Sequence, residues 1–549
     1  TNWESNAHLD KNNYEKFYEK SINDPEGFWS EQALNIDWHK PFTKDAIKKV
    51  NFSKDNLEIK WFYDGKLNVS YNCIDRHLKT KSDNTAIIWE GDNPNESKNI
   101  TYKELHTEVC LMANVLKQRG VKKGDRITIY MPMIPEASYA MLACARIGAV
   151  HSVVFGGFSP DSIADRIIDC KSDFIITADE GYRAGKIIPL KDNVDKALKR
   201  CENVKSVLVI KRTGNEINME PNRDVWWHEE KLTVDSICEP EIMNAEDPLF
   251  ILYTSGSTGK PKGALSSHRG VLSALMSWMM MGSATKQVLN DFNERVEAKY
   301  PPAALLALPL FHVAGSHSSF LLSVIVGRKI VIMRQWDPVE ALKIIEIERI
   351  TTFNGVPTMS AELQEEAKNS KRDFSSLAEI YAGGAARPPT QVEKIAGTFQ
   401  GASPGIGYGL TETNGLGALN SGQFYIAKPG STGRTVPAVT DIKIIDGAGK
   451  TVNAGHEGEV LIKSPANVIG YWNSTEATDE AFVDGWFYTG DIGYLDEDGF
   501  LFLVDRKKDI IIRGGENISC IEVESAFYSY SGIKEVSVFG LSDDRLGEV

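Results

Sequence analysis

The sequence predicts an α/β protein built on parallel sheets, and two features of its first half carry that prediction. The first is a helix with a defined start: Thr101 and Glu104 form a capping box ahead of apolar residues spaced along one helical face as far as Gly120. The second is an alternation of apolar runs with helical runs, which is typical of parallel α/β sheets. Strands are expected at 127–131, 150–155, 174–177, 204–210 and 249–253, and a helix at 136–146.

The pattern changes after Pro429. Short alternating runs such as 441–445 and 458–462 are separated by turns that contain glycine. Alternation of this kind is typical of strands with one buried face. A small β-rich subdomain is therefore expected in this part of the chain.

A charged segment at 505–515 that ends in two glycines is the predicted domain boundary. Residues 1–505 would form one large domain on this interpretation. Residues 506–549 would begin a small α+β domain that is truncated at the end of the chain.

The overall composition limits the possible functions. With 549 residues and 42% hydrophobic content, the chain can bury large cores in more than one domain. Its 61 basic and 75 acidic residues give a net charge of -14, so no general positive field would attract nucleic acid or an anionic membrane. Seven cysteines with no CxxC pair and no metal-ligand spacing indicate buried thiols in a reducing compartment, and we expect a cytoplasmic protein.

Residues 300–327 contain no charged side chain and are long enough to raise the question of a membrane span. Three prolines interrupt this segment, and His312, His317 and several serines make its middle polar. Strand, loop and buried helix fit it better, so no membrane span is expected. The amino terminus has no basic region followed by an apolar run, so no secretory signal is expected either.

A glycine-rich loop follows the expected strand at 249–253. It consists of Thr254, Ser255, Gly256, Ser257, Thr258, Gly259, Lys260, Pro261, Lys262 and Gly263. Small residues allow backbone N–H groups and hydroxyls to close around a phosphate, and the two lysines add positive charge. It is not a Walker loop, because Pro261 stands where that motif needs Ser or Thr. A flexible linker is the alternative, but linkers do not follow buried strands directly, so we expect nucleotide binding.

A second motif, from Tyr408 to Glu412, reads Tyr-Gly-Leu-Thr-Glu. Together with the phosphate loop, it resembles the adenylate-forming superfamily of acyl-CoA synthetases, luciferases and peptide-synthetase adenylation domains, and the resemblance covers nearly the whole chain. It implies that residues 1–505 are an AMP-binding domain in which Tyr408 packs on adenine, Thr411 contacts the α-phosphate and Glu412 holds magnesium. Thr411 and Glu412 would then be catalytic. A carboxylate suits Mg²⁺, although Glu412 taken alone would more often be a solvated surface residue.

Further segments extend the resemblance. Asp491, in a Tyr-Thr-Gly-Asp motif, resembles the ribose-binding aspartate, and one carboxylate can accept hydrogen bonds from both ribose hydroxyls. Arg506 resembles a second ribose contact, and Lys508 the hinge residue before the small domain. The loop on the adenine side would comprise Ala385, Ala386 and Arg387.

The chain up to about Lys262 resembles acetyl-CoA synthetases in particular. The matching segments are 88–92, 130–133, 143–152, 155–160 and 178–186. This resemblance implies that Arg183 and Lys186 engage the phosphates of coenzyme A, although a lysine in place of the more common arginine loses the bidentate fork. The same site would be lined by Phe155, Gly156 and Gly157. Outside the family context, both bases would be ordinary surface residues.

Beyond the phosphate loop, segments 309–315, 407–412 and 504–509 resemble medium- and long-chain acyl-CoA synthetases instead. Natural divergence, recombination and a joining of two gene fragments would each produce such a change of pattern. The resemblance places the acyl pocket at Val313, Gly384 and Gly409. Acetyl-CoA synthetases carry tryptophan where Gly409 stands, so a pocket larger than acetate is expected.

The resemblance implies two reaction steps, in which ATP activates a carboxylic acid as acyl-AMP and the thiol of coenzyme A then displaces AMP. The substrates would be a carboxylate between acetate and a medium-chain fatty acid, Mg·ATP and coenzyme A. Three alternatives stay open: an acetate–CoA ligase proper, an adenylating domain that loads a carrier protein, and a nucleotide-binding fragment with impaired catalysis. The last has two grounds: the catalytic lysine of the family would lie beyond Val549, and the parts of the chain on either side of the phosphate loop would not have been selected together if they came from different proteins. The sequence does not determine the oligomeric state.

Overall fold

The computed structural model divides the chain into two compact units. The first consists of residues 1–252, 265–299 and 320–334, and the second of residues 253–264, 300–319 and 335–549. The structure describes residues 16, 19–20, 23–53, 56–92, 96–183, 186–254, 261–291, 299–436, 440–507, 509, 511–513, 516–518, 520–527, 533, 536–543 and 547–548. The predicted α/β class with parallel sheets is confirmed.

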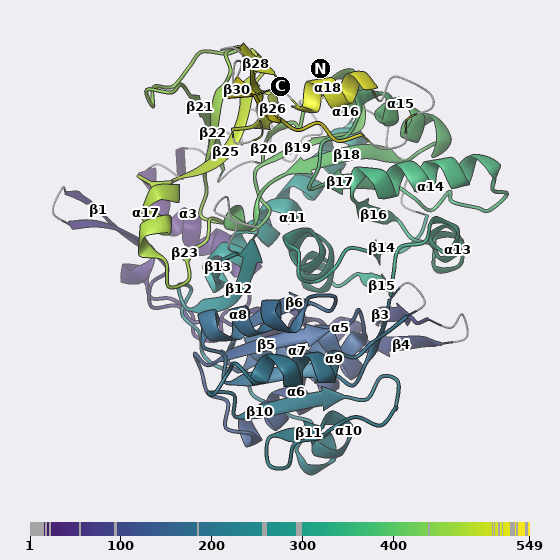
Figure 1. Cartoon of the computed structure of the whole chain (residues 1–549). Coiled ribbons are helices and arrows are strands. Elements are labelled where there is room, and N and C mark those ends of the chain that lie inside the picture. The colour runs from purple at the N-terminus through teal and green to yellow at the C-terminus, as the bar shows by residue number, and fades with distance from the viewer. Residues whose placement is uncertain are drawn as a thin grey trace. The chain divides into compact units, whose positions relative to one another are not determined.

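A parallel sheet forms the centre of the first unit (Figure 1). Its strands lie in the order β11 (Asp224–Trp226), β10 (Ser206–Ile210), β7 (Phe174–Ala178), β5 (Arg126–Met131), β6 (Val150–Phe155) and β12 (Pro248–Thr254). Every pairing from β11 to β12 is parallel. The connecting helices are α7 (Pro135–Arg146), α8 (Pro160–Cys170) and α9 (Leu190–Leu198). The alternation expected from the sequence is therefore confirmed, with strand ends shifted by one or two residues.

The predicted capping box begins the helix that precedes β5. In α6 (Tyr102–Gln118), the Thr101 hydroxyl accepts from the Glu104 N–H at 3.2 Å, and the Glu104 carboxylate accepts from the Thr101 N–H at 2.8 Å. Gly120 follows the helix with a φ of +94°, which glycine adopts without strain. The apolar face of α6 is buried, as its spacing predicted.

The first unit has further helices and strands, among them the long helix α11 (His268–Asp291). The others are α3 (Pro25–Gln32), β1 (Lys48–Ser53), β2 (Asn56–Trp61), α4 (Val69–Cys73), α5 (Leu78–Lys81), β3 (Thr85–Glu90), β4 (Ser97–Thr101), β8 (Gly181–Arg183), β9 (Lys186–Ile188), α10 (Trp227–Glu230), α12 (Leu322–Val326) and β15 (Lys329–Met333). Strand β3 pairs in parallel with β15 and antiparallel with β4. Strand β13 (Lys262–Ser267) belongs partly to each unit.

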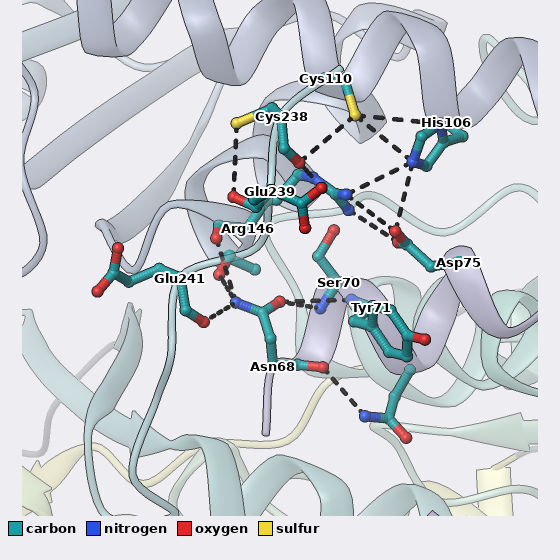
Figure 2. A network of polar contacts seen from close by, with 12 residues as sticks. Asn68, Ser70, Tyr71, Asp75, His106, Cys110, Arg146, Cys238, Glu239 and Glu241 are labelled. Atoms are coloured by element: carbon teal, nitrogen blue, oxygen red, sulfur yellow. Dashed lines mark hydrogen bonds and ion pairs between the residues drawn. The ribbon is translucent and has the colours of Figure 1, made fainter. Parts of the chain in front are cut away.

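A polar network links α4, α6 and α7 in the first unit (Figure 2). Arg146 donates to both carboxylate oxygens of Asp75, at 2.7 and 2.8 Å, and His106 Nε2 lies 3.3 Å from Asp75 Oδ1. Asn68 donates to the carbonyl of Glu241 at 3.0 Å, and Arg146 to that of Cys238 at 2.5 Å. The network therefore ties the start of α4 to the carboxyl end of α7 and to the segment after α10. No motif in the sequence indicated it.

The free energy of unfolding is expected to fall as the pH rises from about 6.5 through about 9. Hydrogen bonds with Asp75 and Cys110 raise the pKa of His106 from 6.5 to about 9, so the folded state binds its proton more tightly than the unfolded state does. This stabilisation is complete below pH 6.5 and is lost above pH 9. Urea unfolding at several pH values measures the slope, and His106→Gln should remove this part of it. An unchanged slope in the variant would contradict the assignment.

The second unit contains another sheet. Its strands lie in the order β20 (Arg434–Thr435), β19 (Ala418–Ser421), β18 (Ser403–Tyr408), β17 (Glu379–Gly383), β16 (Thr352–Gly355) and β14 (Ala303–Leu306). The pairings from β14 to β18 are parallel, and those of β19 are antiparallel. The associated helices are α13 (Pro338–Glu348), α14 (Pro357–Asn369), α15 (Pro389–Thr398) and α16 (Gly422–Ala427). Candidate site residues follow the carboxyl ends of β14, β17 and β18, where parallel sheets bind ligands.

The predicted β-rich region is also present. Strands β21 (Asp441–Ile445), β22 (Gly458–Lys463), β25 (Trp486–Leu495) and β24 (Phe482–Val483) form an antiparallel sheet, and β26 (Leu501–Arg506) pairs with β25. The remaining elements are β23 (Gly470–Tyr471), α17 (Thr475–Ala481), β27 (Ile511–Arg513), β28 (Glu516–Ile518), α18 (Cys520–Phe527), β29 (Ser542–Asp543) and β30 (Gly547–Glu548). The division into domains 1–505 and 506–549 stays a prediction.

Two composition-based expectations concern membranes and cysteines. Among the described residues, no helix has both the length and the apolar character needed to cross a membrane. The uncharged segment 300–327 contains strand β14, a π-helical stretch at Ala314–Leu321 and the short helix α12. All seven cysteines are buried free thiols, as predicted.

Candidate active site

The first cluster of predicted site residues surrounds Asp491 in the second unit. The Tyr408 hydroxyl donates to Asp491 Oδ2 at 2.6 Å, and Arg506 Nε lies 3.4 Å from Asp491 Oδ1. Antiparallel pairing of β25 with β26 sets Asp491 opposite Arg506. Burial raises the pKa of Asp491 although Tyr408 and Arg506 oppose this, so its charge is costly without further donors. The structure thus brings together the residues predicted to hold adenine and ribose.

The second cluster surrounds Glu412, which lies in the short 3₁₀ turn Thr411–Thr413 after β18. Its side chain is buried, with 8% of the residue exposed, and Oε1 accepts from the Tyr471 hydroxyl at 2.8 Å. Burial raises the pKa of Glu412, while Tyr471 and Lys262 oppose the shift. Glu412 is therefore not the solvated surface carboxylate that its residue type alone would suggest. A cation beside it would stabilise its charged form.

The phosphate loop is described only at its two ends. Ser255, Gly256, Ser257, Thr258, Gly259 and Lys260 lie outside the described residues, as does the predicted hinge Lys508. At the far end, Lys262 Nζ lies 5.1 Å from the centre of the Tyr471 ring, and the Trp472 N–H donates to the Gly263 carbonyl at 2.7 Å. Lys262, at the end of the phosphate loop, and Glu412, in the turn after β18, therefore both contact Tyr471.

Tyr471 is a residue that the sequence did not single out. It joins Lys262 to Glu412, yet it stands in an unremarkable Gly-Tyr-Trp segment about sixty residues beyond Glu412. Burial and the Glu412 carboxylate both raise its pKa, so its hydroxyl stays a donor. No spacing rule connects these positions; the β23 strand brings them together.

The loop predicted for the adenine side follows β17. Parallel pairing of β17 with β18 places Gly383 opposite Gly407, so the loop begins beside the strand that ends at Tyr408. Ala385 and Ala386 are exposed, but Arg387 is buried. Its Nη2 donates to the Ser360 hydroxyl at 3.2 Å. Burial also lowers the pKa of Arg387. A contact of Arg387 with a nucleotide stays a prediction.

The three residues predicted for the acyl pocket follow β14, β17 and β18. Val313 is half-buried, and Gly384 has a φ of +78° with open space along its Cβ direction. Gly409 differs: a Cβ there would lie 2.3 Å from the Gly415 carbonyl oxygen and 3.0 Å from the Leu416 nitrogen. The missing side chain at 409 therefore leaves no empty volume in that direction, because the main chain of residues 415–416 fills it.

Gly409→Ala is expected to lower the free energy of unfolding by about 1–3 kcal/mol, because the added methyl must displace main chain. Gly407→Ala is the matched control, since a Cβ there would meet Leu419 Cδ1 at 3.7 Å, an ordinary contact. Urea unfolding of both variants measures the difference. If both variants change the free energy of unfolding equally, the main chain at Gly415 can move to accept the methyl group without loss of stability.

The residues predicted to bind coenzyme A form a cluster in the first unit. Phe155 ends β6, and β8 pairs with β9 so that Arg183 stands opposite Lys186. The Arg183 guanidinium lies over the Phe155 ring at 4.7 Å. A Cβ at Gly157 would lie 2.2 Å from Arg183 Nη1, so this glycine is what permits the contact. Gly156 stands between Phe155 and Gly157, and its carbonyl accepts from the Tyr130 hydroxyl at 3.0 Å.

Comparison with known proteins assigns the family. A model of AMP-binding enzymes matches residues 74–472, and a model of the acetyl-coenzyme A synthetase N-terminus matches residues 14–73. The chain belongs to the acetyl-coenzyme A synthetase family. Acetyl-coenzyme A synthetases of Parvibaculum lavamentivorans, Mesorhizobium japonicum and Bradyrhizobium diazoefficiens are 42%, 40% and 41% identical to it. Each alignment covers 100% of this chain and 84% of the relative.

This family membership bears on the change of motif pattern at the phosphate loop. Similarity to acetyl-coenzyme A synthetases extends over the full chain, on both sides of the loop. It gives no evidence that two proteins were joined there. The motifs after Lys262 that resemble longer-chain enzymes are thus local departures within one family.

Proposed function

We propose that this protein is an AMP-forming acetate–CoA ligase, which activates acetate as acetyl-AMP and transfers the acetyl group to coenzyme A. The observation that carries the proposal is the pair of buried carboxylates, Glu412 and Asp491, each held by a tyrosine hydroxyl beside a basic residue. Two buried carboxylates with raised pKa values in one unit are typical of a functional site. The acetyl-coenzyme A synthetases that match the whole chain support acetate as the acid.

The residues around Asp491 would bind the nucleoside. Its carboxylate would accept hydrogen bonds from both ribose hydroxyls, and Tyr408 would present its ring to adenine while its hydroxyl stays on Asp491. Arg506 stands on the same carboxylate and would be the second ribose contact. This arrangement would fix the sugar, and with it the direction of the triphosphate.

The residues around Glu412 would act on the phosphates. Glu412 fits a single-carboxylate Mg²⁺ site, because the ion takes its other ligands from phosphate oxygens and water. The ion would neutralise charge on the phosphates when bound. Lys262 would add a positive charge nearby, and Thr411 would donate to the α-phosphate. No side-chain nucleophile is required.

Arg183 and Lys186 would receive the phosphates of coenzyme A in the second step. Both are exposed, and among the residues that the structure describes neither forms an ion pair with a carboxylate. Two unpaired bases over a glycine-lined turn suit a phosphorylated small molecule, which favours coenzyme A over a carrier protein as acceptor.

Pyrophosphate exchange and AMP release test the proposal together. Acetate should support exchange of pyrophosphate into ATP, and coenzyme A should be needed for steady AMP release. Exchange without any effect of coenzyme A would favour loading of a carrier protein. Absence of exchange, with ATP still bound in calorimetry, would favour a nucleotide-binding protein without this catalysis.

A second candidate is an acyl-CoA synthetase for longer acids, and the observation that favours it is the resemblance of segments 309–315, 407–412 and 504–509 to medium- and long-chain acyl-CoA synthetases. A series of acetate, propionate, butyrate and hexanoate separates the two. We expect kcat/KM to be highest for acetate and to fall with each added methylene, each worth roughly 1–3 kcal/mol in discrimination. A rise toward hexanoate would establish the longer-chain enzyme.

A further inference from the structure

Arg212 lies outside the proposed coenzyme A cluster but packs against the β8–β9 hairpin, which carries Arg183 and Lys186. The Arg212 side chain is 12% exposed and donates to both carboxylate oxygens of Glu96, at 2.7 and 2.9 Å. It also donates to Asp92 at 2.8 Å. Its guanidinium lies over the Trp89 ring at 5.0 Å and over the Tyr182 ring at 5.5 Å. Tyr182 is the residue directly before Arg183.

A second arginine holds the same tyrosine by its backbone. Arg334 forms an ion pair with Asp92 and donates from Nη1 to the Tyr182 carbonyl at 3.4 Å. Tyr182 is therefore contacted on its ring by one arginine and on its carbonyl by another. Asp92 bridges the two arginines.

The loop that carries Arg212 is itself attached to the start of the hairpin. The Asp179 carboxylate is completely buried and accepts from the N–H groups of Arg212 and Gly214, both at 2.8 Å. Because Asp179 lies two residues before β8, it connects the Arg212 loop to that strand. The hairpin thus has three attachments at its base.

Charge shows that this cluster is not a phosphate site in its own right. Two guanidinium groups, Arg212 and Arg334, face two carboxylates, Asp92 and Glu96, so the charges of the cluster cancel. Both arginines are already paired with carboxylates and have no charge left over for a phosphate. Arg183 and Lys186, in contrast, are exposed on a hairpin whose strands have only three residues each, and so short a pair of strands is marginally stable alone.

We propose that Arg212 is a positioning residue for coenzyme A: together with Asp92, Glu96 and Arg334 it fixes Tyr182, and thereby holds Arg183 and Lys186 where they meet the phosphates. The inference rests on the proposed function. The register of the hairpin explains how Tyr182 can position both bases: Tyr182 pairs with Ile187, and the next pair along the strands is Arg183 with Lys186. Fixing Tyr182 therefore fixes both bases at once.

Arg212→Lys tests the proposal, since lysine keeps the charge and loses both the fork to Glu96 and the stacking on Tyr182. KM for coenzyme A should rise about 10- to 100-fold, as for other displacements of a binding group by a remote change. KM for ATP and for acetate, and pyrophosphate exchange, should not change because they need no coenzyme A. Calorimetric titration with coenzyme A should show the same loss of affinity. Tyr182→Ala, at a residue 37% exposed, is the second variant should Arg212→Lys unfold.

Arg200→Lys is the matched control. Arg200 lies in the first unit and also pairs with two carboxylates, Asp161 at 2.9 Å and Asp165 at 2.7 Å, without contacting the hairpin residues. It should leave KM for coenzyme A unchanged. A loss equal to that of Arg212→Lys would make the effect a general one of ion-pair removal and would overturn the proposal.

A double-mutant cycle decides whether Arg212 acts through the bases. In an Arg183→Ala, Lys186→Ala background, Arg212→Lys should cause no further loss of coenzyme A affinity. A full additional loss would overturn the positioning role. Normal coenzyme A kinetics in both Arg212→Lys and Tyr182→Ala would overturn it as well. Failure of the proposed function has a different signature, because the unaltered protein would then show no acetate-dependent exchange.

Discussion

Glu412→Gln lowers kcat/KM for Mg·ATP by about 10²- to 10³-fold and changes AMP binding little, because only the triphosphate complex needs the metal. The carboxamide keeps the shape of the side chain but supplies no negative charge to a divalent cation. In the structure this carboxylate is buried and has Tyr471 and Lys262 close by, so few other groups would replace it. Initial rates with varied Mg·ATP and calorimetry with AMP measure the two quantities.

Tyr471→Phe is the control for Glu412. It removes the 2.8 Å hydrogen bond and leaves the carboxylate in place, so we expect a loss of only about tenfold, the usual size for one hydrogen bond. Equal losses of ATP use and AMP binding in Glu412→Gln would show instead that Glu412 supports the local fold. A thermal melt of each variant separates that outcome from a loss of metal binding.

Asp491→Ala weakens binding of ATP and AMP alike, by about 100-fold. Both nucleotides carry the same ribose, and hydrogen bonds to a charged acceptor contribute about 1.5–3 kcal/mol each. The variant also removes the acceptor of Tyr408 at 2.6 Å and the partner of Arg506. Calorimetric titration with each nucleotide gives the two dissociation constants. Unchanged constants would remove Asp491 from the site.

Two controls refine the test of Asp491. Tyr408→Phe keeps the ring and frees the carboxylate, so nucleotide affinity should change much less than in Asp491→Ala. Deoxy-ATP, which lacks one ribose hydroxyl, should bind less tightly than ATP to the unaltered protein. That difference should shrink in Asp491→Ala, because the acceptor of the hydroxyl is gone.

Several elements of the first unit were predictable because the signals that set them are local. A capping box and an apolar helical face define α6, and strands β5, β6 and β7 begin and end within one or two residues of the predicted ranges. Burial of both faces makes parallel strands nearly continuous apolar runs. The short runs after Pro429 were equally clear and became β21 and β22.

The candidate site was predictable only where a motif carried its residues. Glu412 and Asp491 stand in such motifs, whereas Tyr471, which joins Glu412 to Lys262, has no sequence pattern of its own. For Arg387, the motif predicted a nucleotide contact, which stays a prediction. The structure adds what the motif did not contain, that the side chain is buried against Ser360 and Tyr425. The direction of a side chain depends on its neighbours in space, which the motif does not contain.

The sequence by itself determined the α/β class, helices α6 and α7, the strands β5, β6, β7, β10 and β12, and the motifs that indicate adenylate chemistry, because these follow from periodicity and from residue types at short spacing. The tertiary structure decided what long-range packing controls. It joined Asp75 to His106 and Arg146, filled the space at Gly409 with the main chain of Gly415, and placed Arg212 under Tyr182. Each of these contacts connects distant parts of the sequence and depends on geometry within a few ångströms, which no local pattern specifies.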